Sequence, residues 1–193
     1  MVGPTKQFDE NRALMNALDV FWSKGFEATS MQELVTAMGV NRASMYQTYG
    51  NKEALFNEAF AQYMESSLIY IKESLEASGS PLGNLKQLLV QLIDQSASKM
   101  SGCFVGNTAA ELAPHNPAMA KKIREFWAKL ETMFNNTLER AQQQNELDTN
   151  VDTKETARFI NSTFQGLLIK SKANVDKELL SIDIEMLFRL IQR

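Results

Sequence analysis

The apolar residues of this chain recur with a helical period almost from end to end, and this pattern limits the fold more than any other feature. Met31, Leu34, Val35 and Met38 follow the i, i+3, i+4, i+7 spacing of one helix face. Longer stripes of the same kind follow along the chain, and no segment of useful length alternates between apolar and polar residues. Because a half-buried strand needs that alternation, the sequence predicts an all-α fold of about nine helices.

Breaks between the stripes divide the chain into two parts. Three helices are predicted near the N-terminus, followed by a long helix from about Asn51 to Ala77. We expect residues 1–52 to form one domain and residues 53–193 a larger helical bundle, with the long helix joining them. A chain of 193 residues is long enough for two small domains with their own cores.

Composition indicates the cellular setting. No apolar run approaches the roughly 18 residues of a membrane span, and the first residues lack the apolar core of a signal peptide. Cys103 is the only cysteine, so no disulfide can form within the chain. We therefore expect a cytoplasmic protein with no membrane partner.

The charge balance does not by itself suggest a nucleic-acid partner. The net charge is −3, and residues 1–60 hold five Lys or Arg against seven Asp or Glu, a local net charge of −2. A DNA-binding domain usually has a basic surface. If this region binds DNA, its positive charge must be local, and affinity should fall quickly as salt is added.

The segment from Met38 to Phe56 nevertheless has the pattern of a helix-turn-helix unit. Gly39 permits the positive φ of a sharp turn between two helices, and Val40 can fill the seam between them. Met45 is expected to pack the short third helix inward. The other face then presents side chains suited to base edges and phosphates in a major groove, namely Arg42, Ser44, Gln47 and Thr48.

Phosphate contacts are predicted on either side of this helix. Tyr46 and Tyr49 lie three residues apart, and we expect their hydroxyls to reach outward. The free N–H groups at the start of the next helix, together with Lys52, would form an anion site. The helix start at Thr29 and Ser30 offers a second such site.

These features together resemble the TetR family of one-component repressors. The resemblance is carried by the segment from Phe21 to Phe56, which reads FWSKGFEATSMQELVTAMGVNRASMYQTYGNKEALF. It implies a homodimer that binds a palindromic operator in double-stranded DNA. The positions that would touch DNA are Gln32, Arg42, Ala43, Ser44, Tyr46, Gln47, Thr48, Tyr49 and Lys52.

The segment departs from the family pattern at a few positions. Many relatives carry several arginines before the first helix, where this chain has only Lys6. Gln47 stands where an aromatic or basic residue is common, and Gly50 where Pro or Lys is common. These differences predict weak non-specific affinity for DNA.

The rest of the chain resembles, more loosely, the C-terminal domain of one TetR subgroup. In the family this domain forms a small-molecule pocket, and its last two helices pair with a second subunit. Two apolar stripes fit either that interface or the core of the monomer, and we favour the interface because the terminal helix has few other partners. They comprise Ile160, Phe164, Leu167, Leu168, Leu180, Ile184, Leu187 and Ile191.

Sulfur-containing and aromatic residues of the same region fit a permissive apolar pocket for an effector, or an ordinary core. The candidates are Met100, Cys103, Phe104, Trp127, Met133, Phe134 and Phe164. No cluster of His, Cys and carboxylates has metal-ligand spacing, so we expect neither a metal nor a cofactor.

The main hypothesis is a repressor released from its operator by a small molecule. One alternative is a helical protein-interaction module that has lost DNA binding, as the acidic N-terminal part suggests. Another is an enzyme that uses Cys103 with His115, although neither lies in a catalytic motif. Cys103 also fits a regulatory thiol or a small buried side chain.

Overall fold

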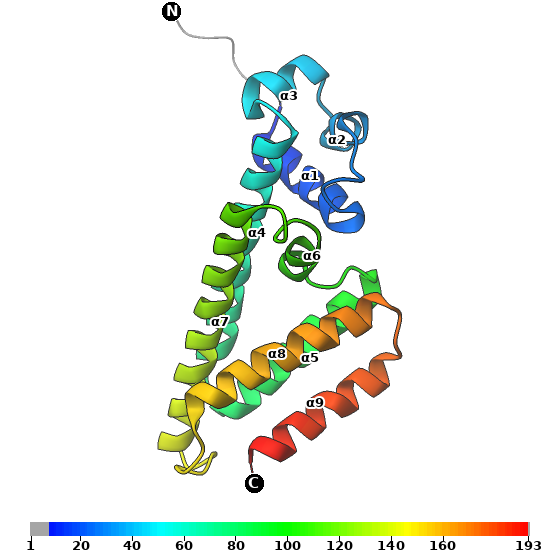
Figure 1. The fold of residues 1–193 in the computed structure, drawn as a ribbon. Coiled ribbons are helices and arrows are strands. Elements are labelled where there is room, and N and C mark those ends of the chain that lie inside the picture. The colour runs from blue at the N-terminus through cyan, green and yellow to red at the C-terminus, as the bar shows by residue number, and fades with distance from the viewer. Residues whose placement is uncertain (1–7, 193) are drawn as a thin grey trace, which may run out of the picture. The chain divides into compact units, whose positions relative to one another are not determined.

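Residues 8–192 are described by a computed structural model, which contains nine helices and no strand within that range (Figure 1). The all-α prediction is confirmed, while Lys6 lies outside the described residues. Across the same range, no helix has the length and apolar character needed to cross a membrane. The helices are α1 (Glu10–Lys24), α2 (Met31–Met38), α3 (Arg42–Tyr49), α4 (Lys52–Glu76), α5 (Pro81–Lys99), α6 (Phe104–Glu111), α7 (Pro117–Gln143), α8 (Thr153–Lys172) and α9 (Lys177–Ile191).

The chain divides into two compact units between Ser66 and Ser67, within α4. The predicted boundary after residue 52 lies earlier, at the start of this helix. The first unit extends further because Phe56 and Phe60 of α4 are fully buried in its core.

An aromatic cluster forms that core. The ring of Phe56 meets Phe21 and Phe26 edge-on, with centroids 5.0 and 5.1 Å away, and stacks on Phe60 at 5.8 Å. Such pairs contribute about 0.5–1.5 kcal/mol each beyond the area that they bury. Because the rings come from α1, from the loop after it and from α4, the cluster fixes these three segments against one another.

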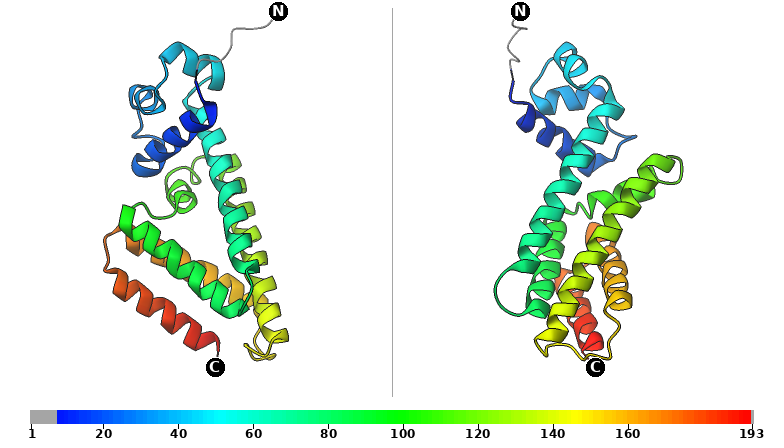
Figure 2. Two further views of the ribbon diagram at one scale, coloured as in Figure 1. Left: turned by 180° about the vertical axis from the view of Figure 1, so that it is seen from behind. Right: turned by 90° about the vertical axis from the view of Figure 1, so that its left-hand side faces the viewer.

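In the second unit, α8 packs against α5 and α7, and α9 packs against α5 and α8 (Figure 2). Ser96 of α5 and Ser171 of α8 are buried, with their hydroxyl oxygens 2.6 Å apart. The Ser171 hydroxyl donates to the carbonyl of Leu168, so the hydroxyl of Ser96 is the donor to Ser171. Two small polar side chains thus satisfy each other where the helices come close.

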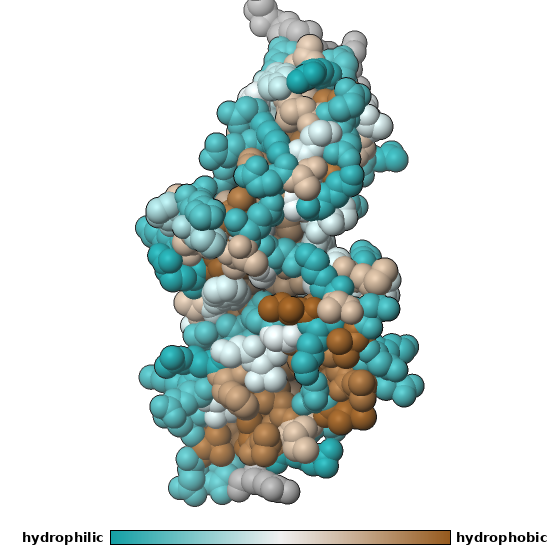
Figure 3. All heavy atoms as spheres, turned by 45° about the vertical axis from the view of Figure 1, so that its right-hand side comes forward, coloured by the Kyte–Doolittle hydropathy of each residue, from teal (hydrophilic) through white to brown (hydrophobic). Residues whose placement is uncertain are grey.

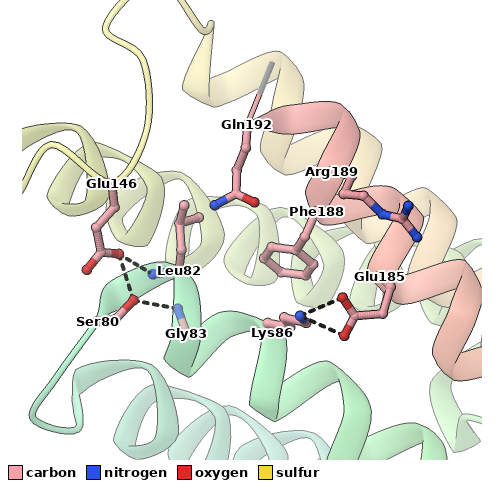
Figure 4. A pocket seen from close by; sticks show the side chains of 9 residues that line it. All are labelled: Ser80, Leu82, Gly83, Lys86, Glu146, Glu185, Phe188, Arg189 and Gln192. Atoms are coloured by element: carbon pink, nitrogen blue, oxygen red, sulfur yellow. Dashed lines mark hydrogen bonds and ion pairs between the residues drawn. The ribbon is translucent and has the colours of Figure 1, made fainter.

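A carboxylate from the connection between α7 and α8 holds the first turn of α5 (Figure 4). Glu146 accepts hydrogen bonds from the Ser80 hydroxyl at 2.8 Å and from the Leu82 N–H at 3.0 Å. The Ser80 oxygen in turn accepts from the N–H of Gly83 at 2.9 Å. Negative charge is favourable here because a helix N-terminus carries partial positive charge.

The two apolar stripes predicted as a dimer interface are buried inside the second unit instead. Helices α8 and α9 each bury one face against the neighbouring helices of their own unit, so these residues already have partners. The alternative, burial in the core of the monomer, is correct for this set. Exposed fractions are between 0 and 8% for Ile160, Phe164, Leu167, Leu168, Leu180, Ile184, Leu187 and Ile191.

Glu146→Gln tests whether the carboxylate stabilises the fold. We expect the variant to lose about 1–2 kcal/mol of unfolding free energy, because a charged acceptor of two hydrogen bonds becomes neutral. Urea unfolding followed by circular dichroism measures this loss. Glu73→Gln makes the same chemical change on the exposed surface of α4 and should stay within about 0.5 kcal/mol of the parent. Equal effects of the two changes would contradict this role of Glu146.

Candidate nucleic-acid interface

The turn between α2 and α3 is built around Gly39, which has φ 67° and ψ 29°. A Cβ at this position would meet no atom within 4 Å, so the left-handed backbone and not crowding favours glycine. The N–H of Val40 donates to the carbonyl of Val35 at 3.2 Å and closes the turn. Asn41 then caps α3 by accepting from the N–H of Ser44 at 2.8 Å. These contacts end one helix and begin the next within three residues.

Helix α3 has one buried and one exposed face. Met45 is fully buried, as predicted, and Tyr49 follows one turn later on the same side. Arg42, Ala43, Tyr46 and Gln47 are exposed, while Ser44 and Thr48 are half-buried. The guanidinium carbon of Arg42 lies 5.8 Å from the centroid of the Tyr46 ring, so a cation–π contact orients the charge along the exposed face.

Tyr49 points inward, contrary to the prediction that both tyrosine hydroxyls reach outward. Its hydroxyl donates to the backbone carbonyl of Glu10 at 3.1 Å. Burial raises the pKa of Tyr49 to about 12, and the charges of Glu58 and Glu10 add to this effect. The reason is helical geometry: residue 49 stands four positions after buried Met45, whereas Tyr46 turns to the other side. Tyr49 therefore anchors α3 to α1.

Thr29 also has a structural role. It is buried, and its hydroxyl donates to the carbonyl of Gly25 at 2.6 Å. The cap of α2 is Ser30 alone, whose oxygen accepts from the N–H of Glu33 at 3.2 Å. The side chain of Thr29 therefore does not form part of the anion site predicted at this helix start.

The predicted anion site at the start of α2 is already occupied by a carboxylate of the chain. Glu33 accepts from the N–H of Ser30 at 2.9 Å and forms an ion pair with Lys24. The hydrogen bond from Lys24, followed by that from the Ser30 backbone, lowers the pKa of Glu33 to about 2. This capping box satisfies the helix N-terminus internally. Gln32, exposed beside it, places its amide nitrogen 3.4 Å from the Thr36 hydroxyl.

The start of α4 has a different arrangement. Asn51 caps the helix by accepting from the N–H of Ala54 at 2.8 Å. The ammonium of Lys52 lies 4.5 Å from the centroid of the Phe26 ring and 3.4 Å from the carbonyl oxygen of Glu27. A helix start leaves backbone N–H groups pointing outward, and the ring holds a positive charge beside them. This site combines a cation with a helix N-terminus, as predicted.

An exposed polar helix, fixed by a buried methionine and preceded by a tight glycine turn, defines a helix-turn-helix DNA-binding protein. Residues 14–59 match the family model described as bacterial regulatory proteins, tetR family. Residues 81–184 match the model described as tetracyclin repressor-like, C-terminal domain, which covers more than half of the chain. The chain therefore belongs to the TetR family.

Individual relatives agree with this assignment. The chain is 31% identical to the uncharacterized HTH-type transcriptional regulator YezE of Bacillus subtilis (strain 168), with 96% of this chain and 97% of the relative covered. It is 28% identical to the HTH-type transcriptional repressor ComR of Escherichia coli (strain K12), with 91% and 85% covered. Both relatives are named as transcriptional regulators, which counts against the enzyme alternative.

A solved structure shares the whole fold. It contains a cysteine mutant of the TetR family transcriptional regulator CifR, complexed with 26-base-pair double-strand operator DNA. Its TM-score to this chain is 0.85 at 28% identity, with 97% of this chain and 98% of the other covered. The resemblance inferred from the sequence is thereby confirmed at the level of the family.

The predicted pocket residues have different environments. Met100 is 55% exposed, because it follows the last turn of α5 with φ 48° and faces outward, which corrects its assignment to a cavity. Phe104, Phe134 and Phe164 are buried core residues. Cys103, Trp127 and Met133 are half-buried. Of this set, Met133 borders a hollow of about 400 Å³ together with Lys72, Leu75 and Arg140.

The structure reveals a second apolar stripe on α8 and α9 that the sequence analysis did not separate from the core. Leu179, Ile182, Met186 and Leu190 of α9 are exposed and follow i, i+3, i+7, i+11 spacing, parallel to the buried stripe. On α8, Phe159 and Ile169 are exposed. Brown residues gather over the lower part of the surface in Figure 3. The spacing of the α9 stripe could have identified it from the sequence.

A hollow of about 360 Å³ lies within this surface. Phe159, Met186 and Leu190 line it together with Gly166, whose missing side chain leaves open space. Lys170 and Asp183 form an ion pair of 2.8 Å beside it and join α8 to α9. We call the exposed residues Phe159, Gly166, Ile169, Leu179, Ile182, Met186 and Leu190 the α8–α9 patch.

Cys103 caps α6, with its sulfur accepting from the N–H of Gly106 at 3.4 Å. Although the residue as a whole is half-buried, burial raises the pKa of its thiol above the ordinary value. His115 is exposed, in the segment before α7. Over residues 8–192, no group of three or more His, Cys, Asp or Glu side chains is placed to hold a metal ion.

The thiol of Cys103 should react slowly with Ellman's reagent in the folded protein. A raised pKa leaves less thiolate at neutral pH than a free cysteine has, so the rate should still be rising with pH above the ordinary thiol pKa. Absorbance of the released thiolate measures the rate without ambiguity, since the chain has one cysteine. The protein unfolded in urea should react as fast as free cysteine. Equally fast reaction of the folded protein would show an activated thiol instead.

Proposed function

We propose that the chain is a homodimeric transcriptional repressor whose helix α3 enters the major groove of a palindromic operator. The observation that supports this most directly is the exposed face of α3, held outward by Met45 and Tyr49 on its other side. Two such helices in a dimer would enter grooves about one helical turn, roughly 34–36 Å, apart.

Base and phosphate contacts fall to different residues. Arg42 and Gln47 carry the donors and acceptors that read guanine and adenine edges, with Ala43, Ser44 and Thr48 beside them. Tyr46 is exposed on α3, and the half-buried Lys52 places its ammonium beside the start of α4, so both fit phosphate contacts. Gln32, exposed at the start of α2, completes the proposed contact set, while the side chain of Ser30 is engaged with Glu33 in the capping box.

The first unit has few positive charges, and this limits the electrostatic part of its affinity for DNA. Arg42 and Lys52 are the cations in the proposed contact set, so a dimer would place about four of them on phosphates or guanines. The two Lys52 side chains are the cations proposed on phosphates, and each neutralised phosphate changes the logarithmic salt slope by about 0.9, so we expect a slope near −2. A helical interaction module that has lost DNA binding would show no binding to the duplex whose strength falls in this way as salt is added.

We propose the α8–α9 patch as the dimer interface. Large apolar side chains exposed in two neighbouring helices are costly in water and favour association with an identical face. The open space at Gly166 would let a partner helix come close. This proposal keeps the two helices named from the sequence but replaces the buried residues with those on the opposite faces.

The second unit is proposed to bind a small-molecule effector. Binding can release DNA only if the effector has higher affinity for a conformation with another spacing of the two recognition helices. Helix α4 belongs to both units and is the covalent route for such coupling. A cytoplasmic location fits this function.

Arg42→Ala and Tyr46→Ala test the reading face. A duplex from the DNA upstream of the protein's own gene, chosen by footprinting, serves as the probe in fluorescence anisotropy. We expect each change to weaken binding by about 1–3 kcal/mol, with Arg42→Ala also relaxing the preference for the base pair that it reads. Lys154→Ala removes an exposed charge from α8 and should leave affinity unchanged. No effect of either change, or no protected site at low salt, would favour the interaction module.

Leu190→Glu tests the dimer interface. Leu190 is 53% exposed, so the change should leave the monomer folded while placing charges against an apolar partner face. We expect monomers by size-exclusion chromatography with light scattering, and weaker operator binding as a result. Ile69→Glu is the matched control, since Ile69 is 52% exposed on α4 and outside the patch. A Leu190→Glu dimer would exclude this surface.

A further inference from the structure

A hollow of about 400 Å³ lies between the end of α4 and the C-terminal half of α7, within the second unit. Its volume is in the range of small-molecule sites. Leu75 and Met133 form the apolar part of the lining, and Lys72, Glu76 and Arg140 form the charged part. A hollow with both kinds of surface fits a ligand that has a charged group on an apolar body.

The side chain of Arg140 is fixed in this hollow through one of its nitrogens. Nη2 donates to the carbonyl oxygen of Leu75 at 2.8 Å and to the hydroxyl oxygen of Thr137 at 3.2 Å. Thr137 is buried, and its own hydroxyl donates to the carbonyl of Met133 at 2.9 Å, so its oxygen is free to accept. The guanidinium is therefore held in one orientation at the C-terminus of α4, where a cation is favourable.

Most of the guanidinium remains available to a ligand. The group has five N–H donors, and those on Nε and Nη1 have no hydrogen-bond partner within residues 8–192. Arg140 is half-buried and forms no ion pair with any described carboxylate. A fixed cation with unused donors is a binding group for an anion, and its planar fork matches a carboxylate.

Lys72 and Glu76 set the charge of the hollow. Both are exposed on α4, and neither forms an ion pair within the described part of the chain. Together with Arg140 they give the lining two positive charges and one negative charge, a net charge of 2 − 1 = +1. One negative charge on a ligand balances this surplus, whereas a second would be repelled by Glu76.

We infer that this hollow is the effector site and that it binds a monoanionic organic acid. The carboxylate would contact Arg140 and Lys72, and the apolar body would pack on Leu75 and Met133, whose flexible thioether adapts to different shapes. This inference rests on the proposed function, since it assigns the place and the chemical class of the effector.

The position of the hollow also fits a regulatory role. A ligand held by Lys72 and Arg140 would bridge α4 and α7, and α4 continues into the first unit. The bridge can weaken operator binding only if the ligand prefers a conformation that differs from the operator-bound one.

A series of 2-naphthoate, 2-naphthamide and acetate tests the two parts of this recognition. The amide has nearly the shape of 2-naphthoate without its charge, and acetate has the charge without the apolar body. In isothermal titration calorimetry of the full-length protein, we expect saturable binding of 2-naphthoate at about 1 mM or lower. The amide and acetate should bind at least tenfold more weakly. Equal affinities for 2-naphthoate and its amide, or no saturable heat with 2-naphthoate, would overturn the inference.

Three substitutions locate the contacts. Lys72→Gln removes an exposed charge and should weaken 2-naphthoate about threefold or more, with an unchanged thermal midpoint. Arg140→Gln should weaken it about tenfold or more, and its thermal midpoint is measured as well because the change removes hydrogen bonds to α4 and Thr137. Glu76→Gln should strengthen 2-naphthoate about threefold, which a purely structural role of these residues would not produce.

Lys121→Gln is the matched control, because it removes an exposed positive charge from α7 outside the hollow and should leave the affinity unchanged. Unchanged binding in both Lys72→Gln and Glu76→Gln would overturn the inference, even if Arg140→Gln does not fold.

Operator binding separates this inference from the proposed function. Saturating 2-naphthoate should weaken binding of the parent protein to the operator duplex about tenfold or more, with a smaller effect on Lys72→Gln at the same concentration. Calorimetric binding without any change in operator affinity would overturn the assignment of the hollow as the effector site. If the parent binds no operator before the probe is added, the proposed function fails, and calorimetry still decides whether the hollow binds organic acids.

Discussion

The burial of one face of a two-turn helix is the constraint on which the nucleic-acid interface depends. Eight residues are too few for α3 to persist as an isolated helix in water. Met45 and Tyr49 hold it against the first unit, and the Tyr49 hydroxyl adds a hydrogen bond to α1. Because these two residues share one face, the opposite face is left exposed for Arg42, Tyr46 and Gln47. Structural and recognition roles are thus divided by helical geometry.

The two helix starts at α2 and α4 differ in their electrostatics, although both belong to the same acidic unit. At α2, the Glu33 carboxylate already satisfies the helix start, and Lys24 stabilises its charge. At α4, an uncharged Asn51 is the cap, and the aromatic face of Phe26 holds the Lys52 ammonium nearby. A carboxylate of the chain therefore fills the start of α2, whereas a cation borders the start of α4, and only the second fits the proposed phosphate contact.

The second unit shows how a single helix can serve two surfaces. Helices α8 and α9 bury one stripe in their own core and expose another, so apolar content alone does not distinguish core from interface. The contact between α7 and α8 includes a buried polar group, since Asn161 is 4% exposed and its amide nitrogen donates to Glu131 at 3.2 Å.

The sequence alone determined the all-α class, the helix-turn-helix and the family, because these follow from local periodicity, glycine positions and short-range motifs. It also placed Met45 inside and Arg42 outside, since one helix face suffices for that inference. Only the tertiary structure decided the role of Tyr49, whose hydroxyl donates to the carbonyl of Glu10, distant in sequence. The same holds for the buried stripe beginning at Ile160, which has an exposed apolar stripe parallel to it. Which face of a two-sided helix is buried depends on what packs against it, and local sequence does not contain that information.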